Sequence, residues 1–307
     1  MICSVDRVQF DGNKLIGFEF YNIDKELKLK NYVEQKTTCL EQLSQFDEFY
    51  KIAYSLIKKD VLVITGDNRK TMTLSDFSSW FCKKNKSAGQ NKRVYSKPLG
   101  IANPENAAGG DRYVQDLLSD LNNNEGYDFS VDDNGLSLAT LALKDEHTLG
   151  FDFDLFSTKC GVVFEFLKRD SEYVNNLTAH PARYPKNKHK FVSLWKAAKK
   201  INPHNPSLYL INYSDNHCED ISVIKVIDFC VCFKTENENK MTLSDIGYKL
   251  ESGRSELLHL LTRFQECCIQ GQKCLDSKKK EIRNTDFWNA YYNFEKHKRP
   301  KIGVNYT

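Results

Sequence analysis

No run of residues in this chain is apolar enough to cross a membrane as a helix, which needs roughly 18 consecutive apolar residues. The first residues, MICSVDR, carry neither a basic leader nor an apolar signal core. Ten cysteines are present, but no Cys-x-x-Cys pair occurs among them, which disfavours a structural zinc site. We therefore expect an intracellular protein, cytoplasmic or nuclear, with no membrane partner and with reduced, mostly buried thiols.

Common catalytic motifs are missing as well. The chain has no phosphate-binding Gly-x-x-x-x-Gly-Lys-Ser/Thr loop, no Gly-x-Ser-x-Gly turn and no His-Glu-x-x-His helix. These absences disfavour ATP-driven, serine-hydrolase and zinc-protease functions.

Acidic residues are absent from two long stretches, 77–104 and 173–214. Both stretches are basic, and positive surface attracts polyanions whatever their sequence. Solvated lysine side chains are the alternative explanation. We take the following as candidate nucleic-acid-binding residues: Lys92, Arg93, Arg183, Lys186, Lys188 and Lys190.

The composition is that of an ordinary globular protein, with 40% hydrophobic and 28% charged residues. We expect an α/β (α+β) fold in four regions: a small α+β unit over 1–82, a basic linker or ligand-ordered loop over 83–110, a core over 111–235 and a helical region over 236–307.

Local patterns predict the elements of the two outer regions. In the first region they predict a hairpin turn at 11–13, a helix over about 40–53, a strand at 60–64 and a helix at 73–81. The last region should contain helices around 257–264 and 287–292. The pentapeptide MTLSD occurs at 72–76 and again at 241–245, and we interpret both copies as helix caps.

The core region reads as an ordered series of elements. The predicted order is a helix at 111–121, strands at 136–143, 148–156 and 162–168, a helix at 187–201, and strands at 207–213 and 221–229.

Two neighbouring strands of this series carry acids at unusual places. Asp152 and Asp154 alternate with apolar residues in FDFDLF, and Glu165 lies inside the apolar run VVFEFLK. Burying an uncompensated carboxylate costs several kcal/mol, and a hard divalent cation such as Mg²⁺ removes that penalty. The alternatives are a polar strand face for Asp152 and Asp154, and for Glu165 an ion pair with Lys168, Arg169 or Lys190.

This order of elements and these acids resemble the PD-(D/E)XK nuclease superfamily, whose restriction-endonuclease-like fold has an αβββαβ core with a mixed central sheet. The resemblance covers about residues 111–229. That family has an Asp at the second strand and Glu-x-Lys on the third. Here Asp154 or Asp152 matches the first acid and Glu165 the second.

The resemblance implies roles for these residues. Asp154 and Glu165 would hold one or two Mg²⁺ ions, for which Mn²⁺ is a plausible substitute, with Asp152 and the main-chain carbonyl of Phe166 as further ligands. The position of the family's lysine is taken by Leu167, and the catalytic cation would be Lys168, turned back by a β-bulge, or Lys190 from the following helix.

The sequence therefore predicts a Mg²⁺-dependent endonuclease that hydrolyses phosphodiester bonds, with DNA favoured over RNA as the partner. The terminal regions would serve substrate selection or self-association as a homodimer. The alternatives are a catalytically inactive nucleic-acid-binding or scaffold protein on the same fold, which the displaced lysine favours, and an RNA-cleaving nuclease.

Overall fold

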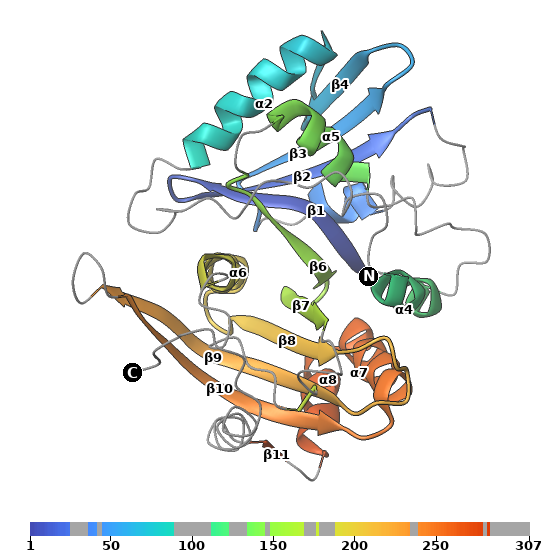
Figure 1. The fold of residues 1–307 in the computed structure, drawn as a ribbon, viewed down its shortest axis with the longest axis vertical. Coiled ribbons are helices and arrows are strands. Elements are labelled where there is room, and N and C mark those ends of the chain that lie inside the picture. Colours follow the sequence, from blue (N-terminus) through green and yellow to red (C-terminus); the bar gives the residue numbers. More distant parts are fainter. Residues whose placement is uncertain are drawn as a thin grey trace, which may run out of the picture.

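The computed structural model describes most of the chain and leaves gaps between the elements (Figure 1). The described residues are 1–24, 36–41, 45–88, 112–122, 134–144, 148–168, 176–177, 188–233, 239–278 and 281–282. Within them, no helix is both long and apolar enough to span a membrane.

One mixed sheet runs through the described parts of the molecule. Its strands lie in the order β11 (Glu281–Ile282), β10 (Asn239–Leu250), β9 (Ile221–Phe233), β8 (Ser207–Tyr213), β7 (Val162–Lys168), β6 (Phe151–Ser157), β1 (Ile2–Asp11), β2 (Lys14–Asn22), β3 (Glu48–Ser55), β4 (Asp60–Thr65) and β5 (Asn68–Thr73). The pairs β2–β3 and β7–β8 are parallel, and the other neighbours are antiparallel.

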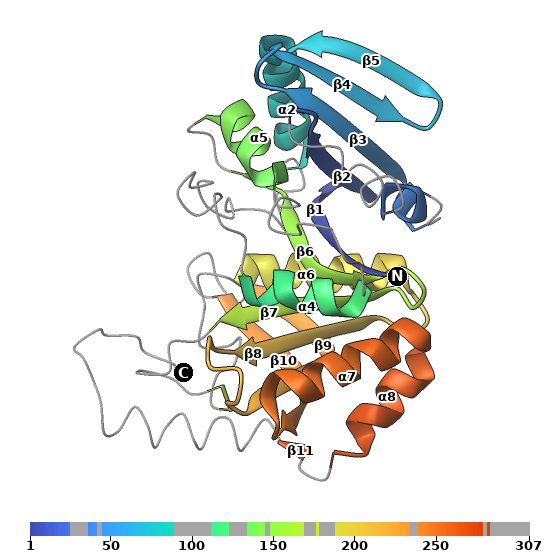
Figure 2. The same ribbon diagram turned by 90° about the vertical axis from the view of Figure 1, so that its right-hand side faces the viewer.

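Helices cover both faces of this sheet (Figures 1 and 2). They are α2 (Leu74–Ala88), α4 (Arg112–Asn122), α5 (Asn134–Leu143), α6 (Lys188–Ile201), α7 (Gly253–Glu266) and α8 (Cys268–Asp276). Helices α2 and α5 pack together over the β2–β4 end. Helix α6 packs with β8 and β9 in a second cluster, and α4, α7 and α8 pack on the opposite face in a third. The α+β class predicted from the sequence is confirmed.

The N-terminal strand β1 joins the two ends of the sheet. It pairs with β2 on one side and with β6 on the other, where Val5 faces Phe153 and Val8 faces Phe151. Two register shifts interrupt the β1–β6 pairing. Residues of the predicted first region therefore hydrogen-bond directly to a strand of the predicted core.

Two segments differ in type from the prediction. Residues 136–143, predicted as a strand, lie in helix α5, because LSLATLAL consists mainly of Leu and Ala, the strongest apolar helix formers. As a result, the αβββαβ order does not occur as consecutive elements. Residues 48–53, predicted as helical, form strand β3, which pairs in parallel with β2 and gains its stability from that long-range ladder.

The predicted outer regions also differ in part. Residues 83–88 of the expected linker continue α2, and 89–110 lie outside the described residues. Residues 239–250 of the expected helical region form β10, which pairs with β9 over most of its length, so the second MTLSD copy lies in a strand. Helix α7 confirms the helix predicted around 257–264, whereas 287–292 lie outside the described residues.

Candidate active site

The predicted acids lie on a β-hairpin followed by a helical crossover. Strands β6 and β7 pair antiparallel, and Leu155 lies opposite Phe164 at the end of their ladder away from the turn. After β7 the chain forms helix α6 and then strand β8, which pairs in parallel with β7. In open α/β sheets the carboxyl ends of parallel strands are the usual place for a ligand. Glu165 and Asp154 are the central residues of their seven-residue strands, so these acids lie in the middle of the hairpin.

Lys190, in the first turn of α6, joins the acids of both strands. Its Nζ lies 2.7 Å from Glu165 Oε1 and 3.1 Å from Asp152 Oδ1. The main-chain N–H of Phe166 donates a hydrogen bond of 2.6 Å to Asp154 Oδ2. The sequence-predicted residues Asp152, Asp154, Glu165 and Lys190 therefore form one group, which we call the acidic cluster.

The charges of the acidic cluster do not balance. Three carboxylates and one ammonium sum to −2 when all are ionised, and the Glu165 side chain is only 3% exposed. The second oxygen of this carboxylate, Glu165 Oε2, is buried and has no hydrogen-bond partner among the described residues. A buried carboxylate oxygen without a partner carries a desolvation penalty. It is therefore a position at which a cation would be stabilising.

Proton affinities reflect this surplus of negative charge. Burial, assisted by the charge of Asp152, raises the pKa of Asp154 to about 7, although Lys190 and the Phe166 N–H oppose the shift. Burial and the charge of Asp154 raise the pKa of Glu165 well above its ordinary range. Burial alone would lower the pKa of Lys190, but the neighbouring carboxylates outweigh it and raise that pKa.

No protein-family model, curated protein or solved structure matches this chain. A functional conclusion therefore rests on the residues of the acidic cluster.

The donor atoms of the cluster fit a hard cation in part. Within the described residues, no three His, Cys, Asp or Glu side chains are arranged to hold a metal ion by themselves. Asp154 and Glu165 offer carboxylate oxygens, one of them without a partner, and Mg²⁺ commonly takes only one or two protein carboxylates and keeps several waters. The main-chain carbonyl of Phe166 stays a predicted ligand.

Lys168 lies apart from the acidic cluster. Its Nζ pairs with Asp215 Oδ1 at 2.7 Å, and its side chain is 50% exposed. The β7–β8 ladder runs in continuous register up to Lys168, without the bulge that would turn this side chain toward Glu165. The structure therefore places Lys190, and not Lys168, beside the acids.

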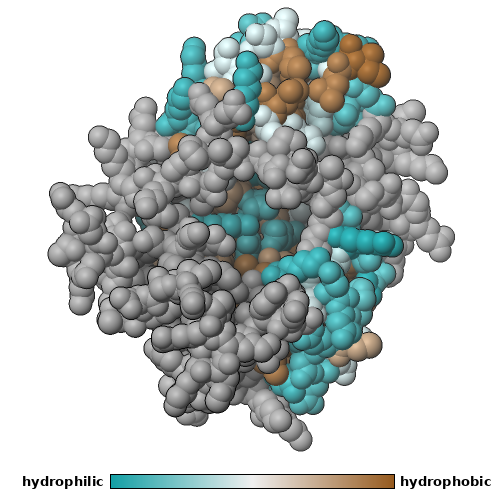
Figure 3. Space-filling view, in the orientation of Figure 1, coloured by the Kyte–Doolittle hydropathy of each residue, from teal (hydrophilic) through white to brown (hydrophobic). Residues whose placement is uncertain are grey.

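The candidate nucleic-acid-binding residues are mostly outside the described part of the chain. This applies to Lys92, Arg93, Arg183 and Lys186, while Lys188 is the first residue of α6. Of the further α6 lysines, Lys199 pairs with Asp228 at 3.5 Å and also lies over the Trp195 ring. Hydrophilic side chains gather in a recessed area in the middle of the face shown in Figure 3.

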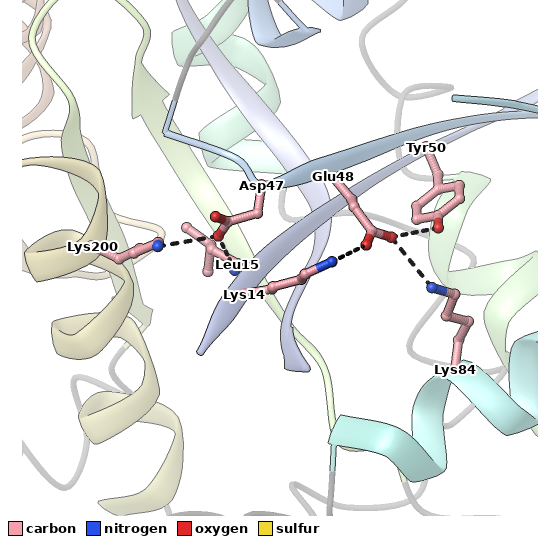
Figure 4. Close-up of polar contacts among 7 residues, drawn as sticks. All are labelled: Lys14, Leu15, Asp47, Glu48, Tyr50, Lys84 and Lys200. Carbon is pink, nitrogen blue, oxygen red and sulfur yellow. Dashed lines mark hydrogen bonds and ion pairs between the residues drawn. The ribbon is translucent and has the colours of Figure 1, made fainter. Parts of the chain in front are cut away.

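A second polar group, which the sequence interpretation did not find, surrounds Glu48 at the start of β3 (Figure 4). Glu48 accepts hydrogen bonds from Tyr50 Oη at 2.6 Å, Lys14 Nζ at 3.1 Å and Lys84 Nζ at 3.3 Å. The Tyr50 hydroxyl, aided by Lys14 and Lys84, lowers the pKa of Glu48 to about 2 against the opposing effect of burial. Since the carboxylate is fully paired, its role is to join β2, β3 and α2.

The neighbouring Asp47 connects this group to α6 (Figure 4). Its Oδ2 accepts the main-chain N–H of Leu15 at 2.7 Å and lies 3.3 Å from Lys200 Nζ. Helix α6, which carries Lys190 at its other end, is thus fastened to the β2–β3 end of the sheet.

A buried arginine, also missed from the sequence, lies behind the start of β6. Arg7 is 5% exposed and donates to Gln9 Oε1, to Asn85 Oδ1 at 2.8 Å and to Thr148 Oγ1 at 2.6 Å. A Cβ added to Gly150 would come within 2.3 Å of the Arg7 guanidinium carbon, so a side chain at this position would displace the buried guanidinium. Arg7 and Asp6 are the two charged residues between Cys3 and Phe10. A charge within this largely apolar segment was the sequence signal that could have identified Arg7.

Proposed function

We propose that this protein is a metal-dependent phosphodiesterase that hydrolyses nucleic acid, with DNA as the favoured substrate. The observation that carries the proposal is the acidic cluster: carboxylates from β6 and β7 and the Lys190 ammonium meet beside the middle of β7, which pairs in parallel with β8. A metal-dependent nuclease uses a bound cation to polarise the scissile phosphate, and a positive side chain nearby stabilises the charge that develops.

Each member of the cluster has a role in this proposal. Asp154 and Glu165 would hold Mg²⁺, with Asp152 at its rim and the Phe166 carbonyl as a further ligand. The bound ion supplies polarisation of the scissile phosphate and a lowered pKa for a coordinated water. Lys190 Nζ stabilises the negative charge that develops on the phosphate oxygens. The Phe166 N–H holds the Asp154 carboxylate in place.

The proposal includes a restriction-endonuclease-like core for this part of the fold. The β6–β7 hairpin, the α6 crossover and the parallel strand β8 follow one another as the later elements of a restriction-endonuclease-like core do. The sheet neighbour of β6 is β1 from the N-terminus, where the sequence interpretation expected a strand at 136–143. In a restriction-endonuclease-like core of this protein, β1 would take the place of the strand expected at 136–143.

A second candidate is a nucleic-acid-binding or scaffold protein without cleavage activity. The Lys190 ammonium already bridges Asp152 and Glu165, which is a neutralising role that a metal ion would otherwise fill. RNA is the alternative substrate of the enzyme, since the same chemistry serves both nucleic acids.

Incubation of the protein with plasmid DNA and with single-stranded RNA, in Mg²⁺, Mn²⁺ or EDTA, tests the proposal. We expect cleavage with either metal and none in EDTA. Asp154→Asn, Glu165→Gln and Lys190→Ala should each lower the cleavage rate by at least about 10²-fold, as loss of a metal ligand or an electrostatic stabiliser does. Lys168→Ala should retain activity near that of the unmodified protein.

The matched control is Asp228→Asn, because Asp228 also pairs with an α6 lysine but lies outside the acidic cluster. Folding of every variant is checked by its thermal unfolding midpoint. Nucleic-acid binding without cleavage in any metal would favour the second candidate. Cleavage that survives Asp154→Asn and Glu165→Gln in a folded protein would refute the active-site assignment.

A further inference from the structure

Two thiols meet at the far end of the β6–β7 hairpin, away from the acidic cluster. Cys160 lies in the turn between the two strands, and Cys268 is the first residue of α8. The Cys268 thiol donates a hydrogen bond of 3.8 Å to the main-chain oxygen of Cys160, so the two cysteines are in contact. Both side chains are partly exposed, so a small solute can reach them.

Their surroundings distinguish the two sulfurs. Cys160 contacts the first residue of α8, and Lys159 precedes it in the chain. Helix N-termini and nearby lysines favour a thiolate. The hydrogen bond from the Cys268 thiol, then these groups, lower the pKa of Cys160 to about 6, and the same hydrogen bond raises the pKa of Cys268. In its neutral form the Cys160 thiol donates to Phe264 O at 3.3 Å.

We propose that Cys160 and Cys268 form a hydroperoxide-sensitive dithiol, in which Cys160 is oxidised first and Cys268 then closes an intramolecular disulfide. This inference does not depend on the proposed nuclease activity. The juxtaposition of a turn thiol with a second thiol at a helix start carries it, since a thiolate with an adjacent resolving cysteine is the arrangement of redox-sensitive sites.

One molecule of hydrogen peroxide supplies the two oxidising equivalents that the disulfide requires. The Cys160 thiolate attacks the peroxide, an S–O bond forms, the O–O bond breaks, and the departing hydroxide takes a proton to become water. The Cys268 sulfur then attacks the sulfenic sulfur of Cys160, an S–S bond forms and the S–O bond breaks. The hydroxide that leaves takes the Cys268 proton as a second water.

The disulfide would fasten the β6–β7 turn to α8. Without it, this turn already contacts the last turn of α7 through the Cys160–Phe264 hydrogen bond. Gly161, with φ +64°, brings the turn close to Ile201 at the end of α6. Oxidation would therefore restrain the turn of the hairpin whose two strands carry Asp154 and Glu165 at their middle.

The test treats the full-length reduced protein with hydrogen peroxide, blocks remaining thiols with N-ethylmaleimide and maps the peptides without reduction by mass spectrometry. We expect a Cys160–Cys268 cross-link that dithiothreitol reverses. Cys160 should also be consumed at least about tenfold faster than the exposed Cys218. Loss of Cys218 while Cys160 stays reduced would overturn the proposal without any variant.

Variants assign the order of the steps. Cys268→Ser should leave a sulfenic acid on Cys160 that dimedone traps, whereas Cys160→Ser should abolish the cross-link. The matched control is Cys267→Ser, next to Cys268 in the chain, which should keep the Cys160–Cys268 cross-link. A cross-link that joins Cys160 to Cys267 would contradict the assignment. So would equal rates of dimedone labelling for Cys268 in the Cys160→Ser variant and for Cys160 in the Cys268→Ser variant.

Discussion

At the residue scale, burial gives Asp154 a different proton affinity in the folded and unfolded chain. The folded protein holds this proton up to a pKa of about 7, whereas an exposed aspartate releases it near pH 4. Between these values the folded state binds more protons, so the free energy of unfolding should fall as pH rises. We expect a loss on the order of 1–2 kcal/mol from pH 5 to pH 8 in EDTA, less than the full shift implies, because the neighbouring Asp152 side chain is half exposed and solvent screens the charges there.

Urea denaturation at several pH values measures this slope. Asp154→Asn should make the slope smaller, because the amide does not titrate, and Glu165, whose pKa is also raised, accounts for the part that persists. Mg²⁺ at millimolar concentration should restore stability at pH 8 if the acidic cluster binds the ion, since a ligand that binds only the folded state stabilises it. Equal stability of the unmodified protein at both pH values in EDTA would show that Asp154 is not buried against its neighbouring charges.

Arg7 offers a second prediction at this scale, which concerns stability alone. Its hydrogen bonds go to the neutral side chains of Gln9, Asn85 and Thr148, so the buried charge has no carboxylate partner within the described chain. Arg7→Ala would leave a cavity and unpaired acceptors, and should lower the free energy of unfolding by about 3 kcal/mol. Arg7→Met, which fills the space without a buried charge, should cost less. Urea midpoints measure both.

The control for Arg7 is Arg69→Ala. Arg69 lies exposed on the edge strand β5, and its loss should change stability by no more than about 0.5 kcal/mol. Equal effects of Arg7→Ala and Arg69→Ala would mean that the Arg7 network does not form.

At the element scale, the two MTLSD copies show how far local sequence determines structure. In the first copy Thr73 precedes α2, and its hydroxyl accepts the main-chain N–H of Asp76 at 3.1 Å and donates to the Asp76 carboxylate. The second copy lies in β10, where pairing with β9 sets the conformation. The same five residues therefore cap a helix or extend a strand, according to contacts that a local pattern does not contain.

The elements around the acidic cluster were predictable for the opposite reason. Strand β7, helix α6 and strand β8 carry strong apolar periodicity, and their observed bounds lie within one residue of the predicted ones. The acids themselves could also be predicted, because Asp152 and Asp154 alternate with apolar residues and Glu165 is the one acid in an apolar run. The sequence left the ion-pair partner of Glu165 open among Lys168, Arg169 and Lys190, because only the crossover geometry brings the α6 N-terminus back over β7.

Removal of the α2 cap gives the prediction at the element scale. Thr73→Ala should lower the free energy of unfolding by about 1 kcal/mol, since it leaves a helix N-terminal N–H without its acceptor. Thermal unfolding followed by circular dichroism measures the change. Ser75→Ala, in the exposed first turn of the same helix, is the control and should be neutral or slightly stabilising. A neutral Thr73→Ala would mean that another group caps α2.

At the scale of the whole molecule, the pairing of β1 with β6 decides whether the predicted regions behave as separate domains. The sheet is continuous across this pair, and Val5, 1% exposed, lies opposite Phe153 in its middle. Helix α6 is also tied to the β2–β3 end through Lys200 and Asp47. We therefore expect the α2 end and the α6 end of the molecule to unfold in one cooperative transition.

Two tryptophans report on the two ends separately, Trp80 in α2 and Trp195 in α6. With Trp288 replaced by Phe, the variants Trp80→Phe and Trp195→Phe each leave one fluorescent reporter, and their urea midpoints should coincide. Val5→Asp places an unpaired carboxylate in the β1–β6 joint and should lower both midpoints together, by about 3 kcal/mol in free energy. The exposed Asp67→Asn is a control that should move neither. Two separated midpoints, or a Val5→Asp effect seen by one tryptophan only, would show that 1–82 and 111–235 fold independently. In a shared sheet, loss of the central β1–β6 pair destabilises both ends.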